Sequence, residues 1–191
     1  MKGYWNRPDA TAEAIDGEGW FHTGDIGELD PQGFLTITDR LKNLLVTAGG
    51  KNIAPQPIEN QVAMSPYIAQ VVMLGDRRPF PVLLVVPEFE HLEGWARGKG
   101  IDTADRAALA ADPRVREFLE QEAFSRLHGL ARYEMPKKIS VLPRDFTIES
   151  GELTPSLKVK RRAVEDHYRD VVEALYAGGR DEGQAGATRS S

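Results

Sequence analysis

Three groups of polar residues lie in or beside predicted turns, where loops carry chemistry on a rigid scaffold. They are the pair Asp25 and Arg40, the turn Gly49-Gly50-Lys51, and the cation cluster at 158–162. A carboxylate offers two acceptor oxygens to the vicinal hydroxyls of a ribose, and a guanidinium offers a planar fork to phosphate or ribose oxygens. Together the three groups indicate a nucleotide or another phosphorylated ligand.

The first two groups also have a simpler interpretation. Asp25 and Arg40 could form an ordinary surface ion pair, which contributes little to stability. Gly49 and Gly50 could serve only as turn residues, because glycine reaches positive φ without strain. Taken singly, neither group decides between a ligand site and a structural role.

The cation cluster is unusual in a chain whose formal net charge is −5. Lys158, Lys160, Arg161 and Arg162 follow a predicted loop and open a predicted helix, where cations are unfavourable against the helix dipole. This placement favours a bound anion over a solvated basic helix start. The pattern leaves open whether Lys158 or Lys160 would act on that anion.

The residues around His22 favour structural roles. No nucleophile lies beside His22 to be activated by it, so packing is a better interpretation than general-base catalysis. Trp20, Phe21 and Phe34 are expected to form the core of a hairpin rather than a stacking surface for bases.

Composition excludes several classes of protein. An acidic balance argues against a nucleic-acid-coating protein, so no nucleic acid partner is expected. The absence of cysteine rules out disulfides and thiolate metal sites, and the four histidines are not spaced as a metal cluster. No apolar run reaches the roughly 20 residues that span a bilayer. We expect a cytoplasmic protein with at most peripheral membrane association.

Local patterns predict an α+β fold in which a small mixed or antiparallel sheet is flanked by helices. Strands are expected at 20–29, 34–39, 44–46, 70–75, 81–87 and 139–142. Helices are expected at 8–14, 55–64, 90–98, 113–130 and 158–176. The stretches 70–75 and 81–87 contain the solid apolar runs VVML and VLLVV, which predict an antiparallel hairpin buried on both faces.

These elements suggest two bodies joined by a charged link. Residues 1–39 form a small hairpin piece, and 44–177 form a compact domain. The link at 40–43, bordered by Asp39 and containing Lys42, is placed where a hinge would absorb backbone rotation. Residues 178–191 contain too little apolar sequence to order themselves and are expected to be a disordered tail.

Three stretches resemble the carboxy-terminal part of the adenylate-forming superfamily, and the long-chain fatty acid–CoA ligases most closely. They are the lead-in MKGYWNRPDATAEAI, the run from Trp20 to Glu59, and GELTPSLKVKR near the end. The resemblance spans about residues 1–162. It implies a lid domain preceded by a hairpin from the end of a larger N-terminal domain.

The resemblance also implies a reaction and a role for each residue. ATP and a fatty carboxylate would give acyl-adenylate and pyrophosphate, and coenzyme A would then give the thioester and AMP. Asp25 would hold the ribose hydroxyls, Arg40 would contact ribose and phosphate, and Lys158 would enter the site during adenylation. Lys42 would be the pivot between steps, and the turn Gly49-Gly50-Lys51 would line the coenzyme A channel.

Two departures qualify the resemblance. Much of the superfamily has Ser-Gly-Lys at the catalytic lysine, whereas Leu157 precedes Lys158 here. The chain also has no phosphate loop, acyl tunnel or acidic Mg²⁺ ligand motif, which would belong to the larger N-terminal domain. We therefore expect a fragment that is inactive alone. The alternatives are the lid of an aryl-CoA or carrier-protein-loading ligase, or an independent module that binds phosphate or nucleic acid.

Overall fold

The computed structural model describes residues 1–177 of the 191-residue chain. These residues form two compact units, one up to Leu44 and one from Leu45 onward, which are described separately. The predicted disordered tail at 178–191 lies outside the described residues. Within 1–177, no helix is both long and apolar enough to cross a membrane.

The first unit contains a short helix and a two-stranded hairpin. Its elements are α1 (Pro8–Ala14), β1 (Asp25–Leu29), β2 (Leu35–Arg40) and the 3-10 turn η1 (Leu41–Asn43). Strands β1 and β2 pair antiparallel, as predicted, with Asp25 opposite Arg40 at the open end of the hairpin. The predicted start of the first strand at residue 20 was wrong, because Gly24 has a φ of 71° and the ladder begins only after it.

The prediction that Trp20, Phe21 and Phe34 form a hairpin core was also wrong. Their exposed fractions are 70%, 44% and 71%. A two-stranded ribbon has no second layer of its own against which both faces could be buried. In this unit Asp39 is the only residue that is classed as buried.

The second unit is built on two small sheets. Strands β3 (Leu45–Val46) and β4 (Asn52–Ile53) form a short antiparallel pair. The central sheet has the order β5-β6-β7, with β5 (Ile68–Leu74) antiparallel to β6 (Val82–Pro87) and β6 parallel to β7 (Lys138–Val141). The sheet is therefore mixed, and the predicted buried hairpin is confirmed.

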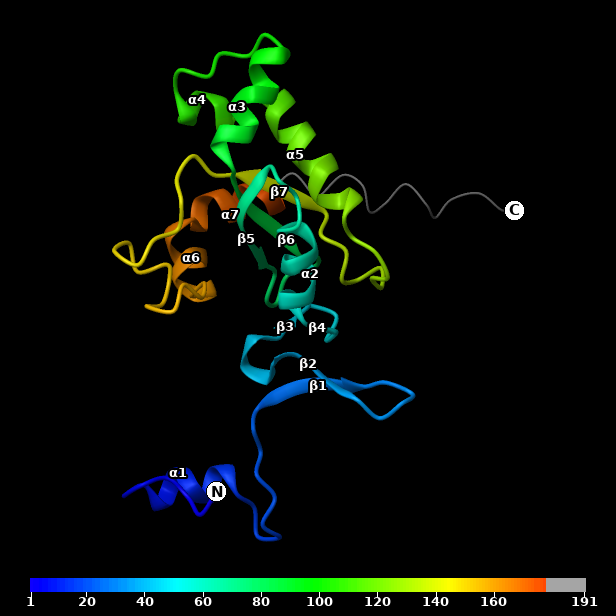
Figure 1. The fold of residues 1–191 in the computed structure, drawn as a ribbon, viewed down its shortest axis with the longest axis vertical. Coiled ribbons are helices and arrows are strands. Elements are labelled where there is room, and N and C mark those ends of the chain that lie inside the picture. Colours follow the sequence, from blue (N-terminus) through cyan, green and yellow to red (C-terminus); the bar gives the residue numbers. More distant parts are fainter. Residues whose placement is uncertain (178–191) are drawn as a thin grey trace, which may run out of the picture. The chain divides into compact units, whose positions relative to one another are not determined.

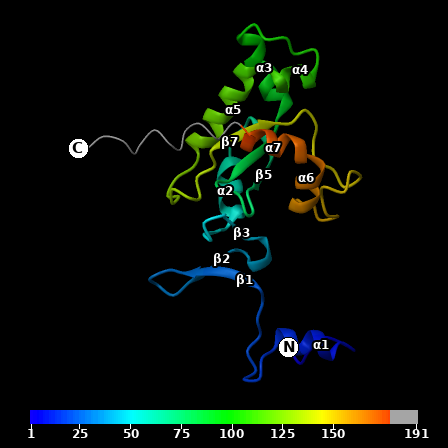
Figure 2. The same ribbon diagram turned by 180° about the vertical axis from the view of Figure 1, so that it is seen from behind.

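Helices cover the central sheet on both faces (Figure 1). Helices α2 (Pro55–Val62) and α5 (Pro113–Ser125) pack on each other and on the sheet, and α6 (Arg161–His167) and α7 (Arg169–Ala177) do the same on the other side. Figure 2 shows the same arrangement from behind. Every residue of β6 is buried, which explains why its sequence is a continuous apolar run.

Two further helices lie between β6 and α5 in sequence. Helix α3 (Phe89–Gly98) was predicted almost to the residue. Helix α4 (Arg106–Ala111) was not predicted, although the Asp105 side chain caps it by accepting from the backbone N–H of Ala107 and Ala108. Asp112 caps α5 in the same way, as its position before a proline indicates.

The last predicted helix, 158–176, was wrong in two respects. It begins at Arg161 rather than Lys158, because the backbone of 153–159 is used in a hairpin. It is also divided at Tyr168, which leaves the helical conformation between α6 and α7. Helix α5 likewise ends at Ser125, before the predicted end at residue 130.

Candidate functional site

Asp25 and Arg40 are brought together in the first unit. They face each other across β1 and β2, and Arg40 Nε lies 3.1 Å from Asp25 Oδ1. Their side chains are 27% and 60% exposed, respectively, so both can reach a ligand. The geometry is that of a solvent-facing acid–base pair at the open end of a hairpin, compatible with either interpretation of the pair.

The predicted hinge residues lie at the end of the same unit. Asp39 is 7% exposed, and its Oδ1 accepts hydrogen bonds from the Arg40 backbone N–H at 2.7 Å and from Asn43 Nδ2 at 3.1 Å. Asp39 therefore holds the short 3-10 turn that contains Lys42, whose side chain is exposed. The turn ends where the first unit ends.

The turn Gly49-Gly50-Lys51 joins β3 to β4 in the second unit. Thr47 organises it: its carbonyl accepts from the Gly50 N–H at 2.9 Å, and its Oγ1 accepts from the Lys51 N–H at 3.0 Å. Gly50 has a φ of 74°, which glycine adopts without strain, whereas Gly49 needs no such conformation. All three residues of the turn are exposed.

The strand before this glycine turn is clamped by the turn between β5 and β6. The Val46 N–H donates to Asp76 Oδ1 at 3.0 Å, and the Val46 carbonyl accepts from the Arg77 N–H at 2.7 Å. The carbonyl of Arg78 also accepts from the Ala48 N–H, and the guanidinium of Arg78 pairs with Glu173 of α7. Hydrogen bonds to the turn between β5 and β6 thus hold the strand that leads into the glycine turn.

Lys158 lies on a tight hairpin, which we call the lysine hairpin (residues 152–160). Leu153 bridges Val159, the Thr154 N–H donates to the Lys158 carbonyl at 2.8 Å, and the Lys158 N–H donates to Thr154 Oγ1 at 3.0 Å. The side chain of Lys158 is exposed. Lys160 is exposed as well, but it lies at the base of the hairpin and is the residue that precedes α6.

Leu157 adopts an unusual backbone conformation beside Lys158. Its φ is 61°, in the left-handed region that leucine rarely enters, and its side chain is 69% exposed. Glycine adopts this left-handed conformation without strain, which explains why it suits this position in the superfamily motif Ser-Gly-Lys. It also explains why the helix cannot start at Lys158.

Glu152 anchors the base of the lysine hairpin. Its side chain is fully buried and accepts two hydrogen bonds from Arg144, at 3.0 and 2.8 Å, and one from Ser150 at 2.7 Å. Burial by itself raises the pKa of Glu152, but hydrogen bonds from Arg144, Ser150 and His167 outweigh it and hold this pKa below its usual value. Glu152 is therefore a buried carboxylate held in its charged form.

The other residues considered from sequence do not form a second centre. His22 Nε2 lies 3.0 Å from Asp16 Oδ2, and Asp16 also accepts from the backbone N–H of Glu18 and Trp20, so the pair organises a local turn. Among residues 1–177, no three His, Asp or Glu side chains gather as a metal site requires.

The sequence interpretation missed the residues that support the site. No local pattern indicates Thr47, Glu152 or the clamp around Asp76, because their hydrogen-bond partners are distant in sequence or belong to the backbone. The one local signal was Thr154-Pro155-Ser156 directly before the lysine, since Thr and Ser commonly bond to nearby backbone groups in turns.

The mixed sheet with helices on both faces is the fold of the C-terminal domain of adenylate-forming enzymes. The adenylation domain of a carboxylate reductase from Mycobacterium chelonae superposes with a TM-score of 0.69 and 35% identity, covering 92% of this chain and 26% of that one. An A-PCP didomain of carboxylic acid reductase from Segniliparus rugosus in complex with AMP gives a TM-score of 0.67 and 32% identity, covering 92% and 23%. Residues 42–180 match the model of the AMP-binding enzyme C-terminal domain, and the chain belongs to this family.

Curated relatives are named as long-chain-fatty-acid–CoA ligases. FadD15 of Mycobacterium tuberculosis is 42% identical over 177 residues, which is 92% of this chain and 29% of the relative. The human ligase ACSBG1 is 38% identical over 193 aligned residues, covering 91% of this chain and 26% of the relative. The chain thus spans less than a third of the length of these relatives.

Proposed function

We propose that this chain is the lid domain, with the end of the preceding large domain, of an ATP-dependent long-chain fatty acid–CoA ligase. In the first step a carboxylate displaces pyrophosphate from ATP and forms acyl-adenylate. In the second step the thiol of coenzyme A displaces AMP and forms the thioester. The observation that carries the proposal is the exposed Lys158 on an anchored hairpin, in a chain 42% identical to a relative named as such a ligase.

Lys158 would serve the first step. Attack of the carboxylate on the α-phosphorus places negative charge on the phosphoryl oxygens, and an ammonium group stabilises this charge without transferring a proton. We favour Lys158 over Lys160 because Lys158 stands beside the tip of the hairpin. The backbone N–H of Lys160 instead donates to the Glu152 carbonyl at the base of the hairpin, at 2.7 Å.

Asp25 and Arg40 would bind the nucleotide, and Lys42 would be the pivot. The pair keeps two carboxylate oxygens and a guanidinium fork available at one hairpin end, which suits ribose and phosphate oxygens. Lys42 and Asp39 would both belong to the hinge. The Asp39 carboxylate accepts hydrogen bonds from the Arg40 N–H and from Asn43, which fix the conformation of the turn that contains Lys42.

The turn Gly49-Gly50-Lys51 would serve the second step. It is exposed, it carries no side chain at two successive positions, and its base is clamped, so its backbone can approach a narrow ligand arm closely. Rotation at the hinge would withdraw the lysine hairpin from the active site and bring this turn into it. One active site would then serve both reactions. Any Mg²⁺ bound with ATP would be held by the larger N-terminal domain of the whole enzyme.

A second candidate acceptor is a carrier protein. Solved structures similar to this chain include an A-PCP didomain of carboxylic acid reductase, so the same lid could present an acyl-adenylate to a carrier thiol. We rank coenzyme A first because FadD15 and ACSBG1 are named as CoA ligases. In either case we expect a cytoplasmic enzyme that needs no nucleic acid.

The test separates the two half-reactions in the full-length protein. Lys158→Ala should slow adenylation, measured by pyrophosphate–ATP exchange with a long-chain fatty acid, by on the order of 10²–10³-fold. Thioester formation from supplied acyl-adenylate and coenzyme A should change little. Lys160→Ala is the matched control, because it removes a neighbouring cation of the same type.

Three outcomes would contradict the proposal. Equal loss of both half-reactions in Lys158→Ala would remove the assigned role of this lysine. A larger adenylation defect in Lys160→Ala would transfer the role to Lys160. A wild-type protein that passes the acyl group to a carrier protein but not to coenzyme A would replace the proposed acceptor.

A further inference from the structure

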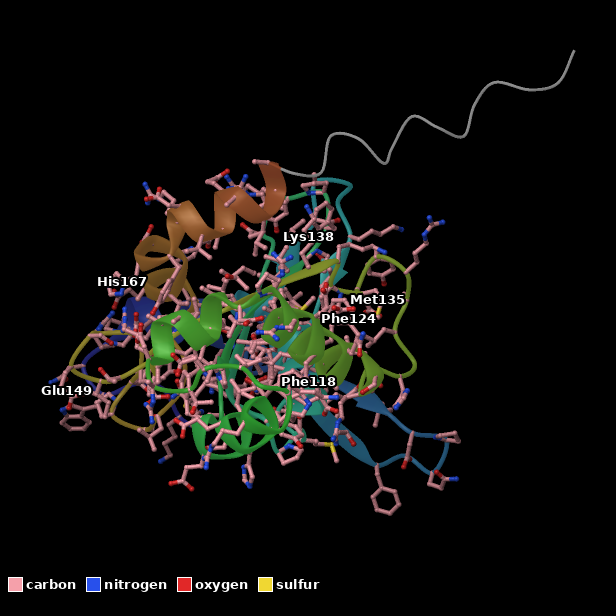
Figure 3. The ribbon with its side chains drawn as sticks, turned by 90° about the horizontal axis from the view of Figure 1, so that it is seen from above. Phe118, Phe124, Met135, Lys138, Glu149 and His167 are labelled. Carbon is pink, nitrogen blue, oxygen red and sulfur yellow. The ribbon has the colours of Figure 1, made fainter. Side chains whose placement is uncertain are left out.

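Glu152 is the most completely bonded buried carboxylate near the lysine hairpin, and nothing in the proposed reaction uses it directly. Its two oxygens accept from Arg144, Ser150 and His167, whose Nδ1 lies 3.1 Å away. These partners come from the loop after β7, from the loop before the hairpin and from α6. Figure 3 shows His167 on α6 and Glu149 in the adjoining loop. One carboxylate thus connects three segments.

The main chain of Glu152 closes the same hairpin. Its carbonyl oxygen accepts from the Lys160 N–H at 2.7 Å, one residue beyond the bridge between Leu153 and Val159. Its own N–H donates to the Thr147 carbonyl at 3.1 Å. Both ends of the hairpin therefore meet at Glu152.

Contacts further along the hairpin are internal to it. Thr154 Oγ1 lies 3.0 Å from Ser156 Oγ and accepts from the Lys158 N–H, while Pro155 to Lys158 are exposed. These internal contacts fix the shape of the tip, whereas the direction in which it points depends on the base. Small errors in the placement of a catalytic group lower the rate by large factors. A lysine near the tip of a hairpin therefore requires that the base of the hairpin be rigid.

We propose that Glu152 is a positioning residue that sets where Lys158 stands, through its side-chain bonds to Arg144, Ser150 and His167. The inference rests on the proposed role of Lys158 in adenylation. Glu152 touches neither the substrate nor the reacting atoms. It acts by fixing the base of the hairpin against α6 and the loop after β7.

A purely structural role for Glu152 predicts a different result. Buried charges with good partners are common, and removing one weakens the whole domain. Such weakening would lower both half-reactions together and would loosen the central sheet as well as the hairpin. A positioning role affects the hairpin and the adenylation step selectively.

The first experiment measures backbone amide exchange in the full-length protein carrying Glu152→Gln. We expect the amides of 154–160 to exchange at least about tenfold faster than in the wild type, while those of β5 and β6 keep their protection. Glu122→Gln is the matched control, because Glu122 of α5 also accepts from a serine, Ser65, and pairs with an arginine, Arg126. Unchanged exchange at 154–160, or equal loosening of β5 and β6, would overturn the proposal.

The second experiment measures the two half-reactions of the same variants. Glu152→Gln should lower the kcat of adenylation by about ten- to a hundredfold, with KM for ATP and the thioester step within about twofold of the wild type. Arg144→Gln, which removes two of the bonds from a half-exposed side chain, should show a smaller change of the same kind if Glu152→Gln does not fold. Glu122→Gln should affect neither step.

The outcomes separate this inference from the proposed function. If Lys158→Ala leaves adenylation intact, the role of Lys158 is wrong and the positioning role fails with it, whatever the exchange data show. If Lys158→Ala abolishes adenylation and both Glu152→Gln and Arg144→Gln do not slow it, only the positioning role is overturned. Equal slowing of both half-reactions by Glu152→Gln would make Glu152 structural.

Discussion

Leu157 shows how one residue can shape a loop at a cost in stability. Its φ of 61° is forced by the tight return of the lysine hairpin, where the Leu157 N–H donates to the Thr154 carbonyl at 2.8 Å. A side chain in this conformation meets its own carbonyl oxygen, at a cost of about 1–2 kcal/mol. The strain lies directly before the proposed catalytic lysine, where stored strain is often found in enzymes.

We predict that Leu157→Gly is more stable than Leu157→Ala by about 1 kcal/mol, because alanine keeps the Cβ atom that causes the strain. Both variants remove the same exposed side chain, so their difference isolates the backbone conformation. The free energy of unfolding in urea measures it. Equal stability of the two variants would show that the backbone at Leu157 is not strained in solution.

At the scale of elements, the lysine hairpin and α6 depend on one charged group. The lowered pKa of Glu152 means that the folded state binds its proton less tightly than the unfolded chain does. The stabilisation is therefore complete above the unfolded value, about 4.3, and is lost as the pH falls through the lower folded value. Acid should thus weaken the hairpin before the apolar core.

We predict that Glu152→Gln lowers the free energy of local opening at residues 154–160 by about 1–3 kcal/mol at pH 7, because a charged hydrogen-bond acceptor is lost from the buried base of the hairpin. The difference from the wild type should shrink as the pH falls below about 4.3, the ordinary value for an exposed Glu, because the opened chain then takes up a proton that the folded carboxylate still refuses. Amide exchange of residues 154–160 at a series of pH values checks this. A gap that stays constant down to pH 2 would contradict it.

At the scale of the whole molecule, the apolar core belongs to one unit. The cluster of buried apolar side chains starts at Leu45 and ends at Val172, and no residue of 1–44 contributes to it. The first unit contains instead the exposed aromatic and aliphatic side chains Trp5, Trp20, Phe34 and Leu35. The two units thus differ sharply in how they are stabilised.

We predict that a chain starting at Leu45 unfolds cooperatively in urea, with a midpoint within about 0.5 M of that of residues 1–191, because the core is complete without the first unit. Circular dichroism and tryptophan fluorescence of Trp95 measure the transition. Residues 1–44 alone should show no cooperative transition, since a lone hairpin is marginal in water. Loss of folding on removing 1–44 would contradict the prediction.

Much of the fold could be predicted because its signals are local. The unbroken apolar runs VVML in β5 and VLLVV in β6 can be satisfied only by burial on both faces, and Asp112-Pro113 caps and starts α5 whatever surrounds it. The hairpin between 29 and 35 brings Asp25 and Arg40 to the same end, but a register shift between Ile26 and Gly27, which the turn does not determine, places them directly opposite each other. The motifs that indicate the family are also contiguous in sequence.

Only the tertiary structure decided where the supports of the site lie. The sequence suggested a helix from Lys158, but the bonds between Glu152 and Lys160 and between Thr154 and Lys158 fold this stretch into a hairpin. Nothing local distinguishes Glu152, whose partner His167 lies on another element, or Asp76, which bonds to Val46. Hydrogen bonds between distant segments form only when the core brings the segments together. The sequence alone thus determined which residues could do chemistry, and tertiary packing decided how they are held.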